Sequence, residues 1–112
     1  MTSRTPGLTE EFIRQYKDKV SWYWISIVQI LSEQFMVEFR DQLDWILISH
    51  HQKLSEEFID KYHNRLDMQG ILVNYKLSRE FIINHANILD IELVVNTQEV
   101  DAELIEYLKL SK

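Results

Sequence analysis

The sequence of 112 residues has no cysteine, one proline and only two glycines. Without cysteine, disulfides, thiolate metal ligands and thiol catalysis are excluded. The two glycines, Gly7 and Gly70, cannot form a glycine-rich phosphate-binding loop. No apolar run approaches membrane-spanning length, and the opening stretch MTSRTPG lacks the apolar segment of a secretion signal. We therefore expect a cytoplasmic protein without membrane segments.

Positive charge is missing from one long stretch of the chain. The net charge is −6, and residues 1–79 carry eleven acidic and ten basic residues. From residue 80 to residue 108 there are seven acids and no lysine or arginine: Glu80, Asp90, Glu92, Glu99, Asp101, Glu103 and Glu106. Because phosphate contacts need clustered lysine and arginine, direct nucleic-acid binding is disfavoured. The acidic stretch indicates a basic partner surface, or it serves solubility.

One short pattern occurs four times. It reads LTEEFI at 8–13, LSEQFM at 31–36, LSEEFI at 54–59 and LSREFI at 77–82, with a step of 23 residues and no insertion or deletion. A fifth, partial copy begins at Val100. A fixed period of this size is typical of stacked repeat proteins. We predict one domain over 8–112, with copies at 8–30, 31–53, 54–76 and 77–99 and a capping half-copy at 100–112. Residues 1–7, which end in Pro-Gly, are predicted to be a mobile tail.

Each copy has the signals of a helix at its start. A serine or threonine with the preference for the N-cap position follows the first leucine, and acidic residues follow in the first turn. Aromatic and aliphatic residues then recur at helical spacing, which predicts a buried face and a first helix of about ten residues. The repeated core positions are occupied by Phe12, Phe35, Phe58, Phe81 and Leu104, and by Tyr16, Phe39, Tyr62, His85 and Leu108.

The second half of each copy allows two interpretations. Ser21, Asp44, Asp67 and Asp90 are N-cap signals before pairs of apolar residues three apart, which favours a short second helix. The runs ISIV, ILVNY and LVVNT are instead rich in β-branched residues, and a 23-residue period also suits αβ units of the leucine-rich-repeat kind. We predict an all-α fold, a small right-handed α-solenoid of about four and a half helix–turn–helix repeats, with the αβ solenoid as the alternative.

Two groups of residues are candidates for partner binding. Tyr23 and Trp24 lie at positions that vary between copies; the favoured interpretation is that they cover the N-terminal end of the stack, and the alternative is a binding hot spot. The acidic candidates are Asp90, Glu92, Glu99, Asp101, Glu103 and Glu106.

Catalytic and metal-binding patterns are missing from the sequence. His50 and His51 diverge by about 100° on a helix and cannot chelate as residues four apart do. His63 and His85 occur at other repeat positions, and no HExxH spacing occurs. The carboxylates recur at helix N-termini, where capping accounts for them. We expect no catalytic residues, no metal and no cofactor.

The repeated wording resembles a known family. The segments LTEEFIRQYKDKVSWYWIS, LSEQFMVEFRDQLDWILIS and LSEEFIDKYHNRLD resemble a short helical repeat of giant DNA viruses, bacteriophages and some bacteria. The first copy matches best, through Lys17, Asp18, Lys19, Val20, Trp22, Trp24, Ile25 and Ser26. The likeness covers residues 8–89 and fades over 90–112. The resemblance implies an all-helical array of viral or mobile-element origin, and it supplies no catalytic residues.

Two functions follow from these observations. The first is a non-enzymatic module or scaffold that binds another protein through an extended solenoid surface; self-association of copies is left open. The second is a phage- or virus-encoded acidic inhibitor of a host nucleic-acid enzyme, of the anti-CRISPR or anti-restriction type. In that case the acidic stretch would occupy the basic groove of a host nuclease or Cas effector in the host cytoplasm.

Overall fold

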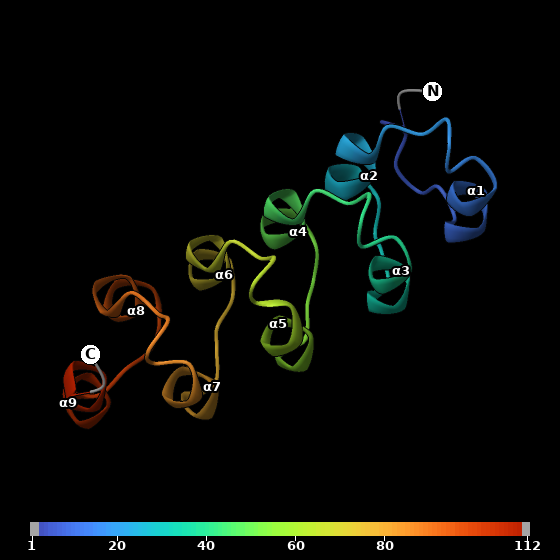
Figure 1. Ribbon diagram of the computed structural model, residues 1–112. Coiled ribbons are helices and arrows are strands. Elements are labelled where there is room, and N and C mark those ends of the chain that lie inside the picture. Colours follow the sequence, from blue (N-terminus) through green and yellow to red (C-terminus); the bar gives the residue numbers. More distant parts are fainter. Residues whose placement is uncertain (1–2, 111–112) are drawn as a thin grey trace. The chain divides into compact units, whose positions relative to one another are not determined.

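The computed structural model describes residues 3–110 and is entirely helical over this range (Figure 1). The prediction of an all-α protein is confirmed. The αβ alternative is wrong, because none of residues 3–110 forms a strand. Within the same range, no helix has both the length and the apolar character needed to cross a membrane.

The described residues form nine short helices in chain order. They are α1 (Glu10–Gln15), α2 (Trp22–Val28), α3 (Glu33–Glu38), α4 (Trp45–His51), α5 (Glu56–Tyr62), α6 (Met68–Asn74), α7 (Arg79–Asn84), α8 (Ile91–Thr97) and α9 (Ala102–Leu110). The odd-numbered helices are the first helices of the predicted copies, and the even-numbered helices are the second ones.

The helix starts are those that the capping pattern predicts. The hydroxyl groups of Thr9, Ser32, Ser55 and Ser78 each accept a hydrogen bond from the backbone N–H three residues later. Side chains of Ser21, Asp44 and Asp90 cap α2, α4 and α8 in the same way, whereas Asp67 makes no such bond to α6. Local capping chemistry therefore overrides the β-branched composition of α2 and α8, whereas α6 is helical without such a bond.

The predicted length of the first helices is wrong. Helices α1, α3, α5 and α7 span six or seven residues instead of about ten, whereas α9 spans nine. In the first copy the backbone N–H groups of Lys19 and Val20 both donate to the carbonyl of Tyr16, at 2.8 and 3.0 Å. These bonds turn the chain just after the helix, so that Ser21 reaches the N-cap position of α2.

Internal contacts divide the chain into two compact units, Met1–Leu66 and Asp67–Lys112, called here the N-terminal and C-terminal units. The boundary falls inside the predicted third copy, 54–76, between α5 and α6. The prediction of a single domain over 8–112 did not foresee this division and stays a prediction. Each unit is described by itself below.

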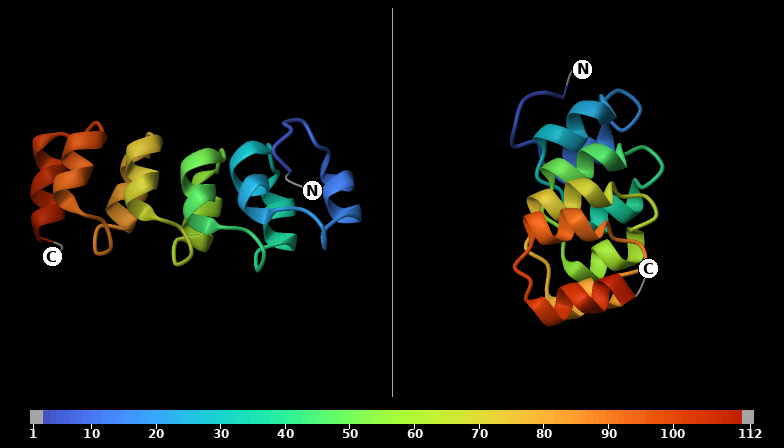
Figure 2. Two further views of the ribbon diagram at one scale, coloured as in Figure 1. Left: turned by 90° about the horizontal axis from the view of Figure 1, so that it is seen from above. Right: turned by 90° about the vertical axis from the view of Figure 1, so that its left-hand side faces the viewer.

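In the N-terminal unit, α1, α3 and α5 follow one another along one side, and α2 packs beside α4 on the other (Figures 1 and 2). The core between them repeats from copy to copy. Its fully buried members include Ile13, Ile25, Phe35, Met36, Ile48 and Ile59. Phe12 and Tyr16, predicted as core, are only half-buried in the first copy.

In the C-terminal unit, α6 packs against α8, and α9 packs against both α7 and α8. A single hydrophobic cluster joins these helices: Leu72, Ile82, Ala86, Leu89, Val94, Leu104 and Leu108. Leu104 and Leu108 are buried, while Glu103, Glu106 and Lys109 on the same helix are exposed. Helix α9 therefore has one buried apolar face and one exposed charged face.

Residues 3–5, called here the N-terminal arm, lie against the first copy. Ser3 is buried, and the Gln29 side-chain amide donates to the carbonyls of Ser3 and Thr5 at 3.2 and 2.6 Å. The predicted mobility of residues 1–7 is not tested by these contacts and stays a prediction; residues 1–2 lie outside the described range.

Candidate interaction surfaces

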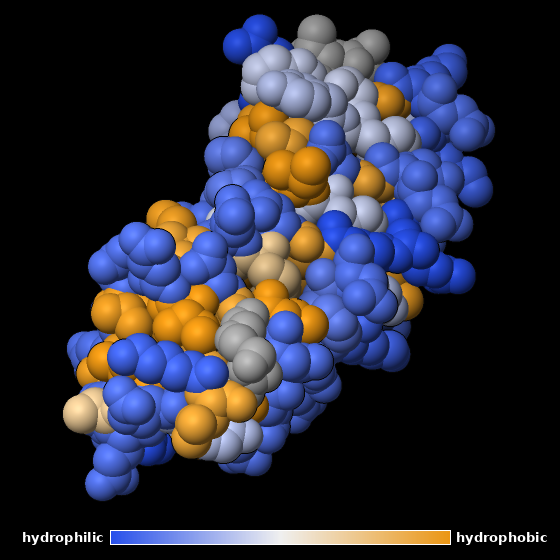
Figure 3. Space-filling view, turned by 60° about the vertical axis from the view of Figure 1, so that its left-hand side comes forward, coloured by the Kyte–Doolittle hydropathy of each residue, from blue (hydrophilic) through white to orange (hydrophobic). Residues whose placement is uncertain are grey.

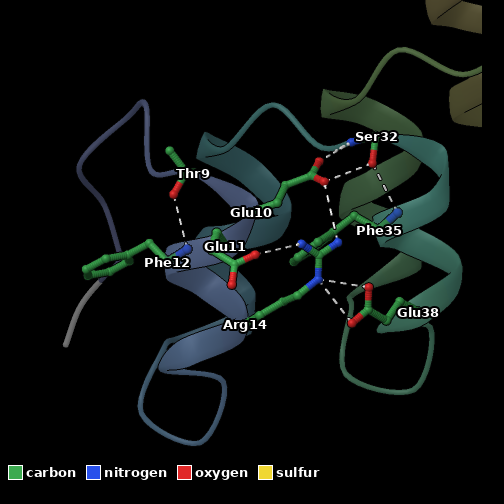
Figure 4. Close-up of polar contacts among 8 residues, drawn as sticks. All are labelled: Thr9, Glu10, Glu11, Phe12, Arg14, Ser32, Phe35 and Glu38. Carbon is green, nitrogen blue, oxygen red and sulfur yellow. Dashed lines mark hydrogen bonds and ion pairs between the residues drawn. The ribbon is translucent and has the colours of Figure 1, made fainter.

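A carboxylate and a helix cap join successive copies in the N-terminal unit. The backbone N–H and the hydroxyl of Ser32 both donate to the Glu10 carboxylate, at 2.7 and 3.0 Å (Figure 4). Ser55 makes the same two bonds to Glu33, at 2.7 and 3.1 Å. Since each serine also caps its own helix, one hydroxyl links the start of a helix to the preceding copy.

The fourth copy uses an arginine–aspartate pair in place of the glutamate–serine pair. Arg79 stands where the earlier copies have glutamate, and Asp101 stands where they have a capping serine or threonine. The Arg79 guanidinium donates to Asp101 at 2.9 Å, and Asp101 accepts from the Leu104 N–H at 2.8 Å. These two hydrogen bonds, the backbone one first, hold the pKa of Asp101 below its ordinary value. Because both residues of the joint differ from those of the earlier copies, a charged side chain again faces a group that can bond to it.

A glutamine makes a second kind of joint, called here the glutamine bridge. The Gln52 amide donates to the carbonyls of Ser26 and Gln29, at 3.1 and 2.6 Å, and its oxygen accepts from the Leu31 N–H at 3.1 Å. Gln98 bonds in the same way to Leu72, Tyr75 and Leu77 in the C-terminal unit. Both glutamines are buried, so these hydrogen bonds are protected from water.

Sequence reasoning missed these glutamines. Gln29, Gln52 and Gln98 share one repeat position, which Tyr75 occupies in the third copy. The 23-residue period could have identified the position, because a polar residue recurs there among apolar neighbours. Its bonding partners are backbone carbonyls, which no sequence pattern reveals.

Aromatic rings stack between copies of the N-terminal unit. The Trp45 ring lies 5.6 Å from that of Tyr62 with an angle of 9° between the planes, and its indole N–H donates to the Arg40 carbonyl at 2.8 Å. Trp22 stacks on Phe39 at 5.0 Å. The tryptophan position is therefore part of the packing between copies.

The structure separates the two predicted aromatic candidates. Tyr23 is 53% exposed, whereas Trp24 is half-buried and its ring is covered by the Arg4 guanidinium, 4.3 Å from the ring centre. The two rings meet edge to face at 5.1 Å. Tyr23 is therefore available at the surface, and its ring packs against the half-buried Trp24 ring.

Two of the acidic candidates contact bases that lie just outside the acidic stretch. Asp101 binds Arg79, as described above, and the Lys109 ammonium donates to Glu106 at 3.4 Å. Both pairs reduce the negative charge that the sequence suggested. Asp90 caps α8 through the Leu93 N–H, and it lines a hollow of about 220 Å³ with Gln69, Glu92 and Leu93. Glu99 and Glu103 are exposed.

Exposed apolar side chains recur on the second helices of the N-terminal unit. Tyr23 on α2 and Ile46 on α4 occupy the same repeat position and are 53% and 60% exposed. The same position holds Gln69 and Glu92 in the C-terminal unit. Hydrophobic groups are visible at the surface between hydrophilic ones in Figure 3. The pair Tyr23 and Ile46, on neighbouring helices, is called here the α2/α4 face.

The N-terminal unit also has a polar surface hollow. A hollow of about 400 Å³ in the N-terminal unit is lined by Lys17, Asp18, Glu38, Phe39 and Gln42. Within residues 3–110, no three histidine or carboxylate side chains lie close enough together to hold a metal ion. Comparison with protein-family models, with curated proteins and with solved structures gave no match to this chain. The resemblance to the viral and bacterial repeat stays a prediction.

Proposed function

We propose that the chain is a helical-repeat solenoid that acts as a non-enzymatic protein interaction module. The proposal is supported by contacts that recur at 23-residue steps within the N-terminal unit: the Glu–Ser joint, the glutamine bridge and the tryptophan stack. Repeats that contact their neighbours in this way build extended surfaces for partner proteins.

The α2/α4 face is the proposed binding surface. The observation that carries the proposal is the placement of two large apolar side chains, Tyr23 and Ile46, more than half exposed at equivalent positions of adjacent helices. Large exposed apolar and aromatic side chains are enriched where proteins bind one another. A protein partner with an apolar contact surface therefore fits this face.

Affinity capture with mass spectrometry tests the proposal. The full chain and a Tyr23→Ser, Ile46→Ser variant serve as bait, and Val73→Ser is the matched control because Val73 is 63% exposed on α6 of the other unit. We expect a partner that binds the unmodified chain and the control but loses at least about ten-fold in affinity for the double variant. Equal binding by all three baits would contradict the assignment of this face.

A second candidate function is favoured by the exposure of acidic side chains in the C-terminal unit. Glu92, Glu99 and Glu103 are all exposed on a stretch without lysine or arginine. We propose as the alternative that they bind the basic groove of a host nuclease or Cas effector. Neutralising the three residues to glutamine is then expected to abolish capture of such an enzyme, and added salt is expected to weaken it. Capture that survives neutralisation contradicts charge mimicry.

A further inference from the structure

The N-terminal arm repeats bonds that a helix makes elsewhere in the same unit. In the second copy, Gln52 binds the carbonyls of Ser26 and Gln29, and the Asp44 N–H donates to the Ser26 hydroxyl at 3.1 Å. These partners belong to the C-terminal turn of α2 and its cap. Carbonyls in the last turn of a helix have no partner within the helix and need one outside it.

The first copy has the same three donors but no preceding helix within the described residues. There the Gln29 amide binds the carbonyls of Ser3 and Thr5, and the Ser21 N–H donates to the Ser3 hydroxyl at 3.0 Å. Ser3 lies 23 residues before Ser26, so the period of the repeat extends into the arm. Ser3 and Ser26 are also equally enclosed, with exposures of 3% and 0%.

The arm provides these groups in a strained conformation. Ser3 has a φ of 60°, in the left-handed region, whereas the equivalent Ser26 lies within α2 and the cap residue Gln29 has a φ of −85°. A residue with a side chain rarely adopts this conformation, because its Cβ comes close to the backbone carbonyl. The arm is therefore a poorer occupant of this surface than the helix turn that it replaces.

We infer that the surface beneath the arm is a docking site for the C-terminal turn of a helix from another chain, and that the arm blocks it. The inference rests on the proposed stacking of repeats. The occupant is a helix with a serine in its last turn, because the equivalent donors of the second copy bind the Ser26 hydroxyl and the carbonyls of Ser26 and Gln29. Gln29 is 1% exposed, so its donors are directed at a partner and not at water.

Removal of the arm's side-chain contacts is expected to open this site. Ser3→Ala removes the acceptor of the Ser21 N–H, and Arg4→Ala removes the guanidinium that covers Trp24. The probe is a synthetic peptide of residues 8–30, which carries α2 with Ser26, and binding is followed by fluorescence anisotropy. We expect the double variant to bind this peptide at least about ten-fold more tightly than the unmodified chain does, because the competing arm is weakened.

Two matched controls separate specific docking from general stickiness. A peptide with Ser26→Ala lacks the hydroxyl and is expected to bind about five-fold more weakly, the effect of one neutral hydrogen bond. Gln29→Glu in the double variant removes the amide donor and is expected to abolish binding. If either control binds as well as its parent, the proposed contacts are wrong.

The outcome also separates this inference from the proposed function. If the double variant keeps its circular dichroism spectrum and binds the peptide no better than the unmodified chain, the docking site is refuted, while partner capture through the α2/α4 face is unaffected. If the double variant loses its helical signal, Arg4→Ala alone is used, since it leaves the Ser3 bonds in place. Its affinity for the peptide is then expected to rise by a smaller factor, and an unchanged affinity overturns the inference.

Discussion

At the residue scale, the most consequential side chains are buried amides and not the conspicuous acids. Gln52 is 6% exposed and joins three backbone groups from two copies. A buried donor or acceptor that loses its partner keeps its full desolvation cost, so the effect of one such side chain exceeds that of an exposed ion pair. The glutamine bridge is therefore where single substitutions should act most strongly.

Gln52→Leu is expected to destabilise the protein. The change keeps the size of the side chain approximately but leaves the carbonyls of Ser26 and Gln29 and the N–H of Leu31 without this partner. We expect a loss of about 3 kcal/mol in the free energy of unfolding, measured by urea denaturation. Gln34→Leu, at an exposed position of α3, is the control and should change the value by less than about 0.5 kcal/mol. Similar losses for both variants would contradict the role of the bridge.

The pH dependence of stability offers a second test at this scale. The pKa of Asp101 lies below its ordinary value of 3.8, first because the Leu104 N–H and then because Arg79 bonds to the charged form. Ionised Asp101 therefore stabilises the fold above that ordinary value, and the contribution is lost as the pH falls through the lower, folded-state pKa.

Asp101→Asn is expected to remove this contribution. The stability difference between the unmodified chain and the variant should be largest at neutral pH and should shrink as the pH falls below the ordinary pKa of 3.8, in urea unfolding at a series of pH values. Glu99→Gln, which removes one charge from an exposed position two residues away, serves as the control. A difference that is independent of pH would show that the Asp101 carboxylate is not held in its charged form.

At the element scale, much of the helical pattern could be predicted and part of it could not. The caps at Ser32 and Ser55 follow from chemistry within four residues, so the sequence located the starts of these helices. The ends are set by turns such as the one at Tyr16. The bonds that Ser3 and Gln52 make to backbone groups span 18 and 21 residues. The repeat period can mark such positions in the sequence, but it does not identify the groups to which they bond.

The exchanged joint of the fourth copy can be transplanted. Glu33→Arg removes the acceptor of Ser55, and Ser55→Asp places a second carboxylate beside Glu33, so each single change is expected to cost about 1 kcal/mol of unfolding free energy. Together they recreate the pairing of Arg79 with Asp101, in which Asp101 still caps its helix. The double variant should recover at least half of the summed loss.

The double-mutant cycle isolates this joint from general effects of charge. The control combines Glu57→Arg with Ser55→Asp. It introduces the same two residue types, but the arginine stands at an exposed position of α5, and Glu33 is left unchanged. This control should show little coupling. If the losses of unfolding free energy for Glu33→Arg and Ser55→Asp add up to the loss for the double variant, the arginine and the aspartate do not interact, and the proposed pairing is wrong.

At the scale of the whole molecule, the copies are alike in their first helices and diverge in their second ones. From residue 67 onward, Met68, Leu72 and Tyr75 replace the tryptophan, serine and glutamine of earlier copies. The division into two units begins at the same place. The N-terminal unit thus contains the most regular joints, and it is the part where the repeat hypothesis can be tested most directly.

Duplication of residues 31–53 within the N-terminal unit is the whole-molecule test. In the duplicated chain, Leu31 of the added copy follows Lys53 of the original copy. The contacts between these two copies would again include a glutamine bridge and a Glu–Ser joint. Because the stability of a repeat array is a sum of repeat and interface contributions, we expect unchanged helicity per residue by circular dichroism and a higher urea midpoint. An insertion of the same 23 residues in scrambled order should lower both. If the true duplication behaves like the scrambled one, successive copies do not stack through equivalent contacts, and the proposed solenoid is wrong.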